Sequence, residues 1–276
     1  MAGNKTEAQR LLGRRSTAVA GPLPGVVTIK SPRELEAMRQ AGRVVARTMS
    51  ALLAAVRPGV TTRELDELAA SQIKRMGASP AFLGYRGFPA TICTSFNEEI
   101  VHGIPGDRAV REGDVLKLDV GAVVDSFYGD SAVSVCVGEV PPRVRELVEV
   151  TRQALEAGIK AARPGARLGD IGYAVQSVAE AHGFSVVREY VGHGIGRALH
   201  EEPPVANFGT PGRGTVLQPG MTIAIEPMLN IGGWETRVLG DDWTVVTADG
   251  SLSAHFEHTL HISPKGPEVL TARGEA

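Results

Sequence analysis

The chain has 276 residues, of which 43% are hydrophobic and 22% are charged, and its formal net charge is −2. This composition is that of a folded globular protein, and it lacks the strongly basic balance typical of proteins that bind nucleic acid. With two cysteines, no signal-peptide core and no apolar run of the roughly 18 residues that cross a membrane, we expect a cytoplasmic protein without disulfides.

Residues 1–28 are rich in small, polar and basic residues and include the Pro/Gly-rich element GPLPG at residues 21–25. We expect a flexible N-terminal arm there, because such a segment cannot bury enough apolar surface to fold. The following residues, 29–272, are predicted to form a single domain.

Two capping boxes mark the first helices. Ser31 and Glu34 form one box, which predicts a helix that ends near residue 56, before an Arg-Pro-Gly stop. Thr61 and Glu64 form the other, which predicts a helix that ends at Gly77.

This helix pair occurs twice in the chain. Residues 52–79 align without gaps with residues 158–185, and both segments contain a helix, an Arg-Pro-Gly stop and a second helix that ends in glycine. We infer two related halves, about residues 31–140 and 141–270, within one domain. A ligand site is expected where the halves meet.

Segments with β-strand patterns follow each helix pair. The predicted strands are residues 90–95, 114–124, 127–137, 186–191, 222–229, 243–247 and 254–262. Turn residues such as Asp125-Ser126 favour antiparallel pairing, so the expected fold class is α+β.

Four acidic residues interrupt these predicted strands. Asp119 and Asp130 lie on the two strands of one hairpin, close enough in register to share a face, while Glu226 and Glu257 lie in later strands. Alternation would place His255 and Thr259 on the same face as Glu257. Buried carboxylates must be paired or protonated, and Lys117 is the nearest basic residue. Two divalent cations would balance four negative charges.

The stretch GHGIGRALH at residues 192–200 contains His193 and His200. It fits a surface loop, a phosphate-binding loop or a metal site, although Arg197 stands where the dinucleotide motif requires its third glycine. With the four carboxylates, His193 would complete a donor set suited to manganese, iron(II) or cobalt. The glycines would let the backbone approach the metals, and His200 would face a substrate carbonyl. An open site with two metals activates water for hydrolysis.

The motifs NEEIVHGIPG, LKLDVG, FYGDSA, GHGIGRALHEEP, AIEPML and SAHFEHT together resemble those of type I methionine aminopeptidases, over about residues 27–270. The resemblance implies the two-fold "pita-bread" fold, with helices packed on a curved antiparallel sheet. It also implies two divalent metal ions per chain and co-translational removal of the N-terminal methionine from nascent polypeptides with a small second residue.

The resemblance also implies a role for each motif residue. The metal ligands would be Asp119, Asp130, His193, Glu226 and Glu257, with Asp130 and Glu257 bridging. His102 would contact the substrate near the scissile amide, His200 would assist at the carbonyl, and Glu226 would handle the proton of the attacking water.

The methionine pocket would be formed by Tyr85, Phe88, Cys93 and Trp243, a combination of aromatic rings and sulfur that suits a thioether. Phe82 stands where bacterial relatives often have cysteine, so the shape of this pocket is expected to differ from theirs. The element GPLPG resembles one in extended type I enzymes, where it would contact the ribosome or another protein, but for so short a segment a plain linker is the favoured interpretation.

Two other functions stay open at this point. A prolidase-like Xaa-Pro aminopeptidase would use the same five ligands, but those proteins usually carry a separate N-terminal domain. A non-catalytic pita-bread module would bind proteins with its pocket, but that class typically loses the ligands that this sequence retains.

Overall fold

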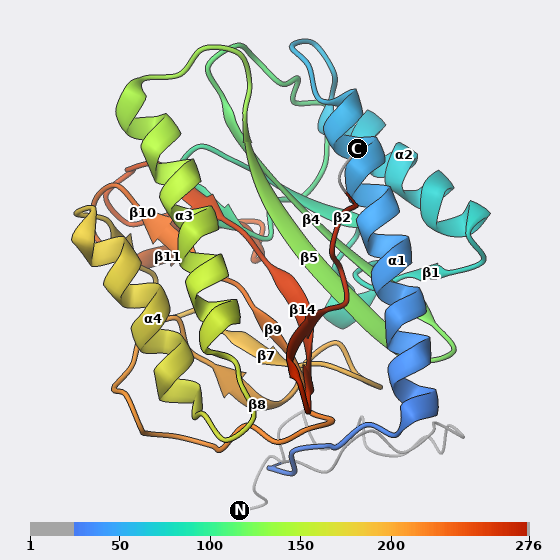
Figure 1. Ribbon diagram of the computed structural model, residues 1–276. Helices are drawn as coiled ribbons and strands as arrows, with labels where there is room; N and C mark the ends of the chain where they lie inside the picture. Colours follow the sequence, from blue (N-terminus) through green and yellow to red (C-terminus); the bar gives the residue numbers. More distant parts are fainter. Residues whose placement is uncertain (1–24, 275–276) are drawn as a thin grey trace, which may run out of the picture.

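The computed structural model describes residues 25–274 and has the mixed helical and antiparallel architecture expected from the sequence (Figure 1). Residues 1–24, where most of the predicted arm lies, are outside the described residues. None of the helices within residues 25–274 combines the length and the apolar character that a bilayer crossing requires.

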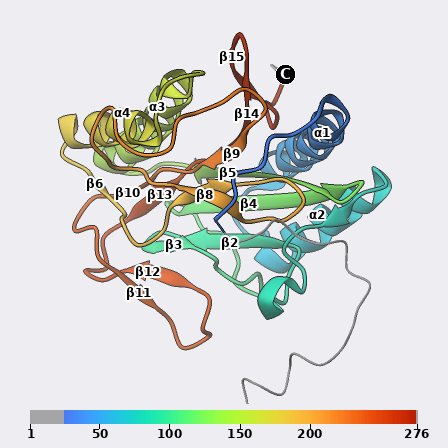
Figure 2. The same cartoon turned by 90° about the horizontal axis from the view of Figure 1, so that it is seen from below.

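The long helices form two consecutive pairs, α1 (Pro32–Ala55) with α2 (Thr62–Arg75) and α3 (Pro142–Ala161) with α4 (Leu168–Ala181). A short 3-10 turn, η2, covers Tyr85–Gly87. Figure 2 shows α1, α3 and α4 on one side of the strands. The helices cover this side because each buries one apolar face against the sheets, and the resulting core joins residues from both halves.

Both predicted capping boxes are present. Ser31 Oγ accepts a hydrogen bond from Glu34 N, and the Glu34 carboxylate accepts one from Ser31 N at 2.9 Å. Thr61 and Glu64 form the same reciprocal pair at the start of α2. The two helices therefore begin where the sequence predicts, because local side chains satisfy their first N–H groups.

The strands are mostly short, and the β4–β5 hairpin is the longest pairing. They are β1 (Ser79–Pro80), β2 (Ile92–Phe96), β3 (Glu99–Val101), β4 (Val115–Val124), β5 (Phe127–Cys136), β6 (Ser185–Val186), β7 (Gly192–Gly194), β8 (Glu201–Val205), β9 (Thr222–Ile225), β10 (Met228–Asn230), β11 (Thr236–Val238), β12 (Val245–Thr247), β13 (Ser253–His255), β14 (His258–Ser263) and β15 (Gly266–Val269).

These strands form two principal sheets and two small ones, and the pairings are antiparallel as predicted. One principal sheet has the order β1-β4-β2, with β5 also paired to β4, and the other has the order β15-β14-β9-β7-β8. The small sheets are β13-β10-β6 and β11-β12-β3. The third strand of the last sheet, β3, comes from the first half of the chain, so this sheet joins the two halves.

The two halves repeat each other down to individual hydrogen bonds. After α1, Gly59 N donates to Val110 O at 2.9 Å, and after α3, Gly165 N donates to Leu217 O at the same distance. Val110 N and Leu217 N each return a bond, to Val60 O and to Ala166 O. The two related halves expected from the repeat are thus visible in equivalent backbone contacts, as the pita-bread fold implied by the resemblance requires.

Several predicted strands are wrong in extent. The predicted strand 222–229 divides into β9 and β10, and the predicted strand 254–262 divides into β13 and β14. Pro227 has no N–H to continue a ladder, and Glu257 N leaves the ladder to donate to Ala132 O on β5 at 3.0 Å. The expected common face for His255, Glu257 and Thr259 is therefore interrupted.

The predicted strand 186–191 is also wrong, because only Val186 belongs to a strand there, in β6. The predicted strand 243–247 is shortened to β12, because Trp243 and Thr244 donate backbone hydrogen bonds to the Asp241 carboxylate, which forms a turn. These corrections shift strand ends but keep the order of the elements.

A buried ion pair fixes the start of the domain to the segment that carries His200. Lys30 Nζ lies 2.6 Å from Glu201 Oε2, and both side chains are almost fully buried. Glu201 also accepts hydrogen bonds from Thr28 Oγ1, Arg197 N and Ala198 N. The residues just after the predicted arm thus help to place the loop that ends at His200.

We expect Lys30→Met to destabilise the protein by about 3 kcal/mol, because it leaves the Glu201 carboxylate buried without its cation. Urea denaturation measures this loss, and Lys160→Met, at an exposed position of α3, is the matched control. A Lys30→Met protein as stable as the control would show that the ion pair contributes nothing to the fold.

Candidate metal centre

The β4–β5 hairpin brings two carboxylates to one face. Asp119 is paired with Ala132, and Asp130 is paired with Gly121, so the two acids are offset by two positions along the ladder. Because side chains alternate between faces, this offset puts both carboxylates on the same side as diagonal neighbours. The register predicted from the sequence is confirmed.

The two glutamates lie at the interruptions of the strands. Glu226 follows β9 directly, and Asn207 Nδ2 holds its carbonyl oxygen at 3.0 Å. Glu257 lies between β13 and β14, where Ser131 Oγ donates to its carbonyl oxygen at 2.7 Å. The two strand interruptions, which were not predicted from the sequence, therefore direct the side chains of Glu226 and Glu257 toward Asp119 and Asp130.

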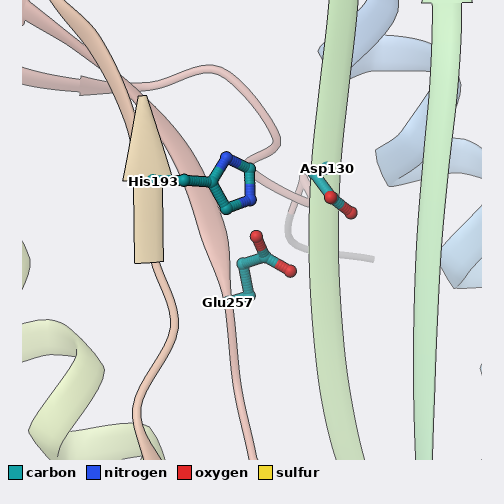
Figure 3. A group of neighbouring side chains, drawn as sticks. All are labelled: Asp130, His193 and Glu257. Carbon is teal, nitrogen blue, oxygen red and sulfur yellow. The ribbon is translucent and has the colours of Figure 1, made fainter. Parts of the chain in front are cut away.

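His193 completes the group from the middle of β7. Its Nδ1 lies 2.9 Å from Gly194 O, and its Nε2 faces Glu226 Oε1 at 3.6 Å. Figure 3 shows the side chains of Asp130, His193 and Glu257 pointing toward one another from three different segments. One candidate ligand atom from each of these three lies within 4.8 Å of the other two.

The glycines around His193 are required by close approach of neighbouring strands and side chains. A Cβ at Gly192 would collide with Ala224 O of β9, and a Cβ at Gly194 would collide with Glu202 O of β8. At Gly196 it would collide with the Lys30–Glu201 ion pair. These glycines allow neighbouring strands to pack closely around His193; their predicted role in letting the backbone approach the metals stays a prediction.

The environment disfavours charge on every acid in the group. Desolvation raises the pKa of Asp119 to about 7. It also raises the pKa of Asp130, Glu226 and Glu257 well above the usual range, and repulsion from the neighbouring carboxylates adds to the effect. By contrast, burial lowers the pKa of His193 to about 4, so its imidazole is neutral and able to ligate a metal.

Several buried polar atoms in this group have no hydrogen-bond partner within the described residues. They are Asp119 Oδ1, Asp130 Oδ1, Glu257 Oε1 and His255 Nε2. Unpaired carboxylate oxygens cost free energy in a protein interior, and divalent cations would satisfy them. The donor set of four carboxylates and one imidazole therefore fits hard or borderline divalent ions.

Lys117 does not offset these acids. Its Nζ donates to the carbonyl oxygens of Asn97 at 2.7 Å and Ser253 at 3.1 Å. Within residues 25–274 it forms no ion pair with a carboxylate, so the nearest basic residue leaves the four acids uncompensated.

Every site residue predicted from the sequence lines one cavity of about 280 Å³. Beside the five candidate ligands, these are Tyr85, Phe88, Cys93, His102, His200 and Trp243. Arg86, Tyr190 and Leu199 also line the cavity and were not predicted from the sequence, although Leu199 lies within the GHGIGRALH motif and Tyr190 stands two residues before it. The position of His255 Nε2, which faces Glu226 Oε2 at 3.7 Å, was not predicted either.

Two neutral histidines face the cavity beside the acids. Burial lowers the pKa of His102 to about 4 and the pKa of His200 to about 3. Tyr85 Oη lies 2.8 Å from His200 Nδ1, and the His102 ring contacts Tyr190 and Trp243 edge to face. The backbone of His102 has a φ of 63°, a left-handed conformation that residues other than glycine rarely adopt.

Known proteins are similar to this chain in sequence and in fold. The sequence pattern described as "Metallopeptidase family M24" matches residues 36–264. "Methionine aminopeptidase 1" of Bacillus subtilis is 48% identical over 246 residues, which cover 89% of this chain and 99% of that protein. The crystal structure of methionine aminopeptidase from Thermotoga maritima has a TM-score of 0.89 and 47% identity, and covers 90% of this chain and 100% of its own.

A more distant structure shares the fold alone. Prolidase from Pyrococcus furiosus has a TM-score of 0.72 at 23% identity, and the match covers 90% of this chain but 66% of the prolidase chain. The pita-bread fold is thus common to both kinds of peptidase.

We expect the apparent affinity for Mn²⁺ to rise with pH between about pH 5.5 and pH 7, because the raised pKa of Asp119 means that its proton must leave before the ion binds. The other three acids act in the same direction, whereas His193 is already neutral there. Titration calorimetry of metal-free protein measures the affinity. A constant affinity over this range would contradict the assigned carboxyl pKa values.

Proposed function

Because the chain belongs to metallopeptidase family M24, we propose that it removes the N-terminal methionine from nascent polypeptides whose second residue is small. The observation that carries this proposal is the convergence of all predicted ligand and substrate residues on one cavity. Two relatives named methionine aminopeptidase, matched over about nine-tenths of this chain, support it.

We propose that Asp119, Asp130, His193, Glu226 and Glu257 hold two divalent ions, with Asp130 and Glu257 shared between them. Five donors cannot fill the coordination of two ions, so positions stay open for water and substrate. When bound, such ions lower the pKa of water and polarise a carbonyl group. The ligand types suit manganese, iron(II) or cobalt.

The chain's own groups then divide the remaining work. Glu226 borders the cavity with its side chain 14% exposed, and we assign it to accept the proton of the attacking water. His200 donates a hydrogen bond to the carbonyl oxygen as negative charge develops there. A Tyr85 hydroxyl that donates to His200 Nδ1 leaves the imidazole proton on Nε2, which is the form that can donate.

The apolar part of the cavity is assigned to the methionine side chain. Phe88 and Trp243 pack edge to face with ring centroids 5.1 Å apart, and Cys93 lies buried beside them. Burial and the nearby acids raise the pKa of the Cys93 thiol, so it is a neutral, polarizable contact for a thioether. His102 is placed to contact the substrate near the scissile amide.

The alternative functions are less well supported. An Xaa-Pro peptidase shares the fold at 23% identity, whereas the methionine aminopeptidases share about twice that identity along nearly their whole length. A non-catalytic binding module has no need for orphaned carboxylates around a neutral imidazole. The nascent chain is therefore the proposed substrate, and the ribosome is the partner proposed for the N-terminal arm.

Two substitutions should separate metal binding from turnover. Asp130→Asn removes a shared ligand, so we expect loss of both bound metal and activity, while His200→Ala should lower kcat by about 10²- to 10³-fold with metal retained. Asp125→Asn and His182→Ala, both at exposed positions, are the matched controls. Metal analysis and methionine release provide the readouts. Full metal occupancy in Asp130→Asn would refute the shared ligand.

Substrate choice tests the proposed reaction itself. We expect release of methionine from Met-Ala-Ser and little release from Met-Lys-Ser, because the proposed activity accepts only a small second residue. The same protein should leave Xaa-Pro dipeptides intact. Equal cleavage of the two tripeptides would contradict the proposed preference for a small second residue. Cleavage of Xaa-Pro dipeptides alone would show that the protein is an Xaa-Pro peptidase instead.

A further inference from the structure

Lys117 is a buried lysine that has no carboxylate partner within residues 25–274. It lies on β4 with 2% of its surface exposed, and its Nζ donates to two backbone carbonyl oxygens, those of Asn97 and Ser253. A buried ammonium is costly to keep, and a methionine or leucine would fill the same space without that cost. The placement of its acceptors suggests what it does.

The two acceptors lie on segments that lead to the site from different directions. Asn97 occupies the turn between β2 and β3, with a φ of 49°, and β3 leads on to His102. Ser253 begins β13, which leads to Glu257. Lys117 itself stands two residues before Asp119 on β4. One ammonium group therefore joins the three segments that carry Asp119, His102 and Glu257.

Further hydrogen bonds connect the same segments around Lys117. Asn97 O also accepts a bond from Ser253 N at 3.0 Å, so the turn and β13 are joined directly as well. The Asn97 side chain accepts from Val115 N at 2.9 Å and donates to Asp114 Oδ1 at 3.0 Å, which ties the turn to the start of β4. Lys117 therefore belongs to a group of hydrogen bonds that joins the β2–β3 turn, β13 and the start of β4.

We propose that Lys117 is a positioning residue, a tethered internal cation that holds the segments of Asp119, Glu257 and His102 in the arrangement required for metal binding and turnover. For turnover, the inference rests on the function proposed above. For metal binding, the inference rests on the observed contacts alone, so the role of Lys117 and the proposed function can fail separately.

The direction in which Mn²⁺ affinity changes when Lys117 is replaced distinguishes a positioning role from a purely electrostatic one. A positive charge beside a cation site repels the ions, so its removal by itself would tighten binding. If the ammonium instead fixes the ligand segments, its removal loosens the ligand set and weakens binding. Loss of a group that orients metal ligands costs roughly 10- to 100-fold in affinity or activity.

The test compares Lys117→Met with Val175→Ala, a core change on α4 that lowers stability away from the site. Calorimetric titration of the metal-free proteins with Mn²⁺ gives affinity, and release of methionine from Met-Ala-Ser gives kcat and KM. We expect Lys117→Met to bind Mn²⁺ roughly 10- to 100-fold more weakly and to lose kcat to a similar extent. Val175→Ala should keep wild-type values.

Two further variants keep the test decisive if Lys117→Met does not fold. Lys117→Gln keeps N–H donors without the full charge and should retain more affinity than Lys117→Met. Lys117→Ala leaves space for a small ammonium ion, and methylammonium should restore part of its Mn²⁺ affinity and turnover. Tetramethylammonium at equal ionic strength has no N–H to donate and should restore nothing.

Wild-type or tighter Mn²⁺ binding by the folded Lys117 variants would overturn the proposal, as would equal effects of the two ammonium salts on Lys117→Ala. If the wild-type protein binds Mn²⁺ but releases no methionine, the proposed function fails. The affinity comparison still decides the role of Lys117 in that case.

Discussion

Burial of four carboxyl groups around one cavity sets the main physical demand on this protein. Desolvation raises the pKa of all four, repulsion between neighbouring carboxylates adds to this at Asp130, Glu226 and Glu257, and buried oxygens on Asp119, Asp130 and Glu257 have no hydrogen-bond partner within the described residues. Such an arrangement is unfavourable in isolation, so the fold must hold the groups in place, and the divalent ions proposed above would compensate them. The hairpin register and the two interrupted strands provide that placement.

The buried lysines within residues 25–274, Lys30 and Lys117, do not neutralise the four acids. Lys30 pairs with Glu201 and so supports the loop that ends at His200, while Lys117 donates to carbonyl oxygens beside the segments of His102 and Glu257. Both cations are used to build the frame around the cavity, and the charge of the four acids is left for divalent ions to balance.

Sequence reasoning succeeded where the signal is local or periodic. The capping residues Ser31 and Thr61 set the helix starts, and alternation along one hairpin placed Asp119 and Asp130 on a common face. It failed where contacts between segments far apart in the chain determine the structure. The apolar pattern continues through Glu226 and Glu257, so the strand interruptions there, which depend on Pro227 and on contacts with β5, are not visible in it. The tight packing at Gly192 and Gly194 likewise depends on strands far along the chain.

We propose that Asp119, Asp130, His193, Glu226 and Glu257 together hold a pair of divalent ions. Crystals grown with Mn²⁺ allow anomalous X-ray diffraction to locate these ions. We expect two neighbouring manganese peaks within the group, each in contact with Asp130 and Glu257. A single peak, or peaks bound elsewhere with these side chains uncoordinated, would contradict it.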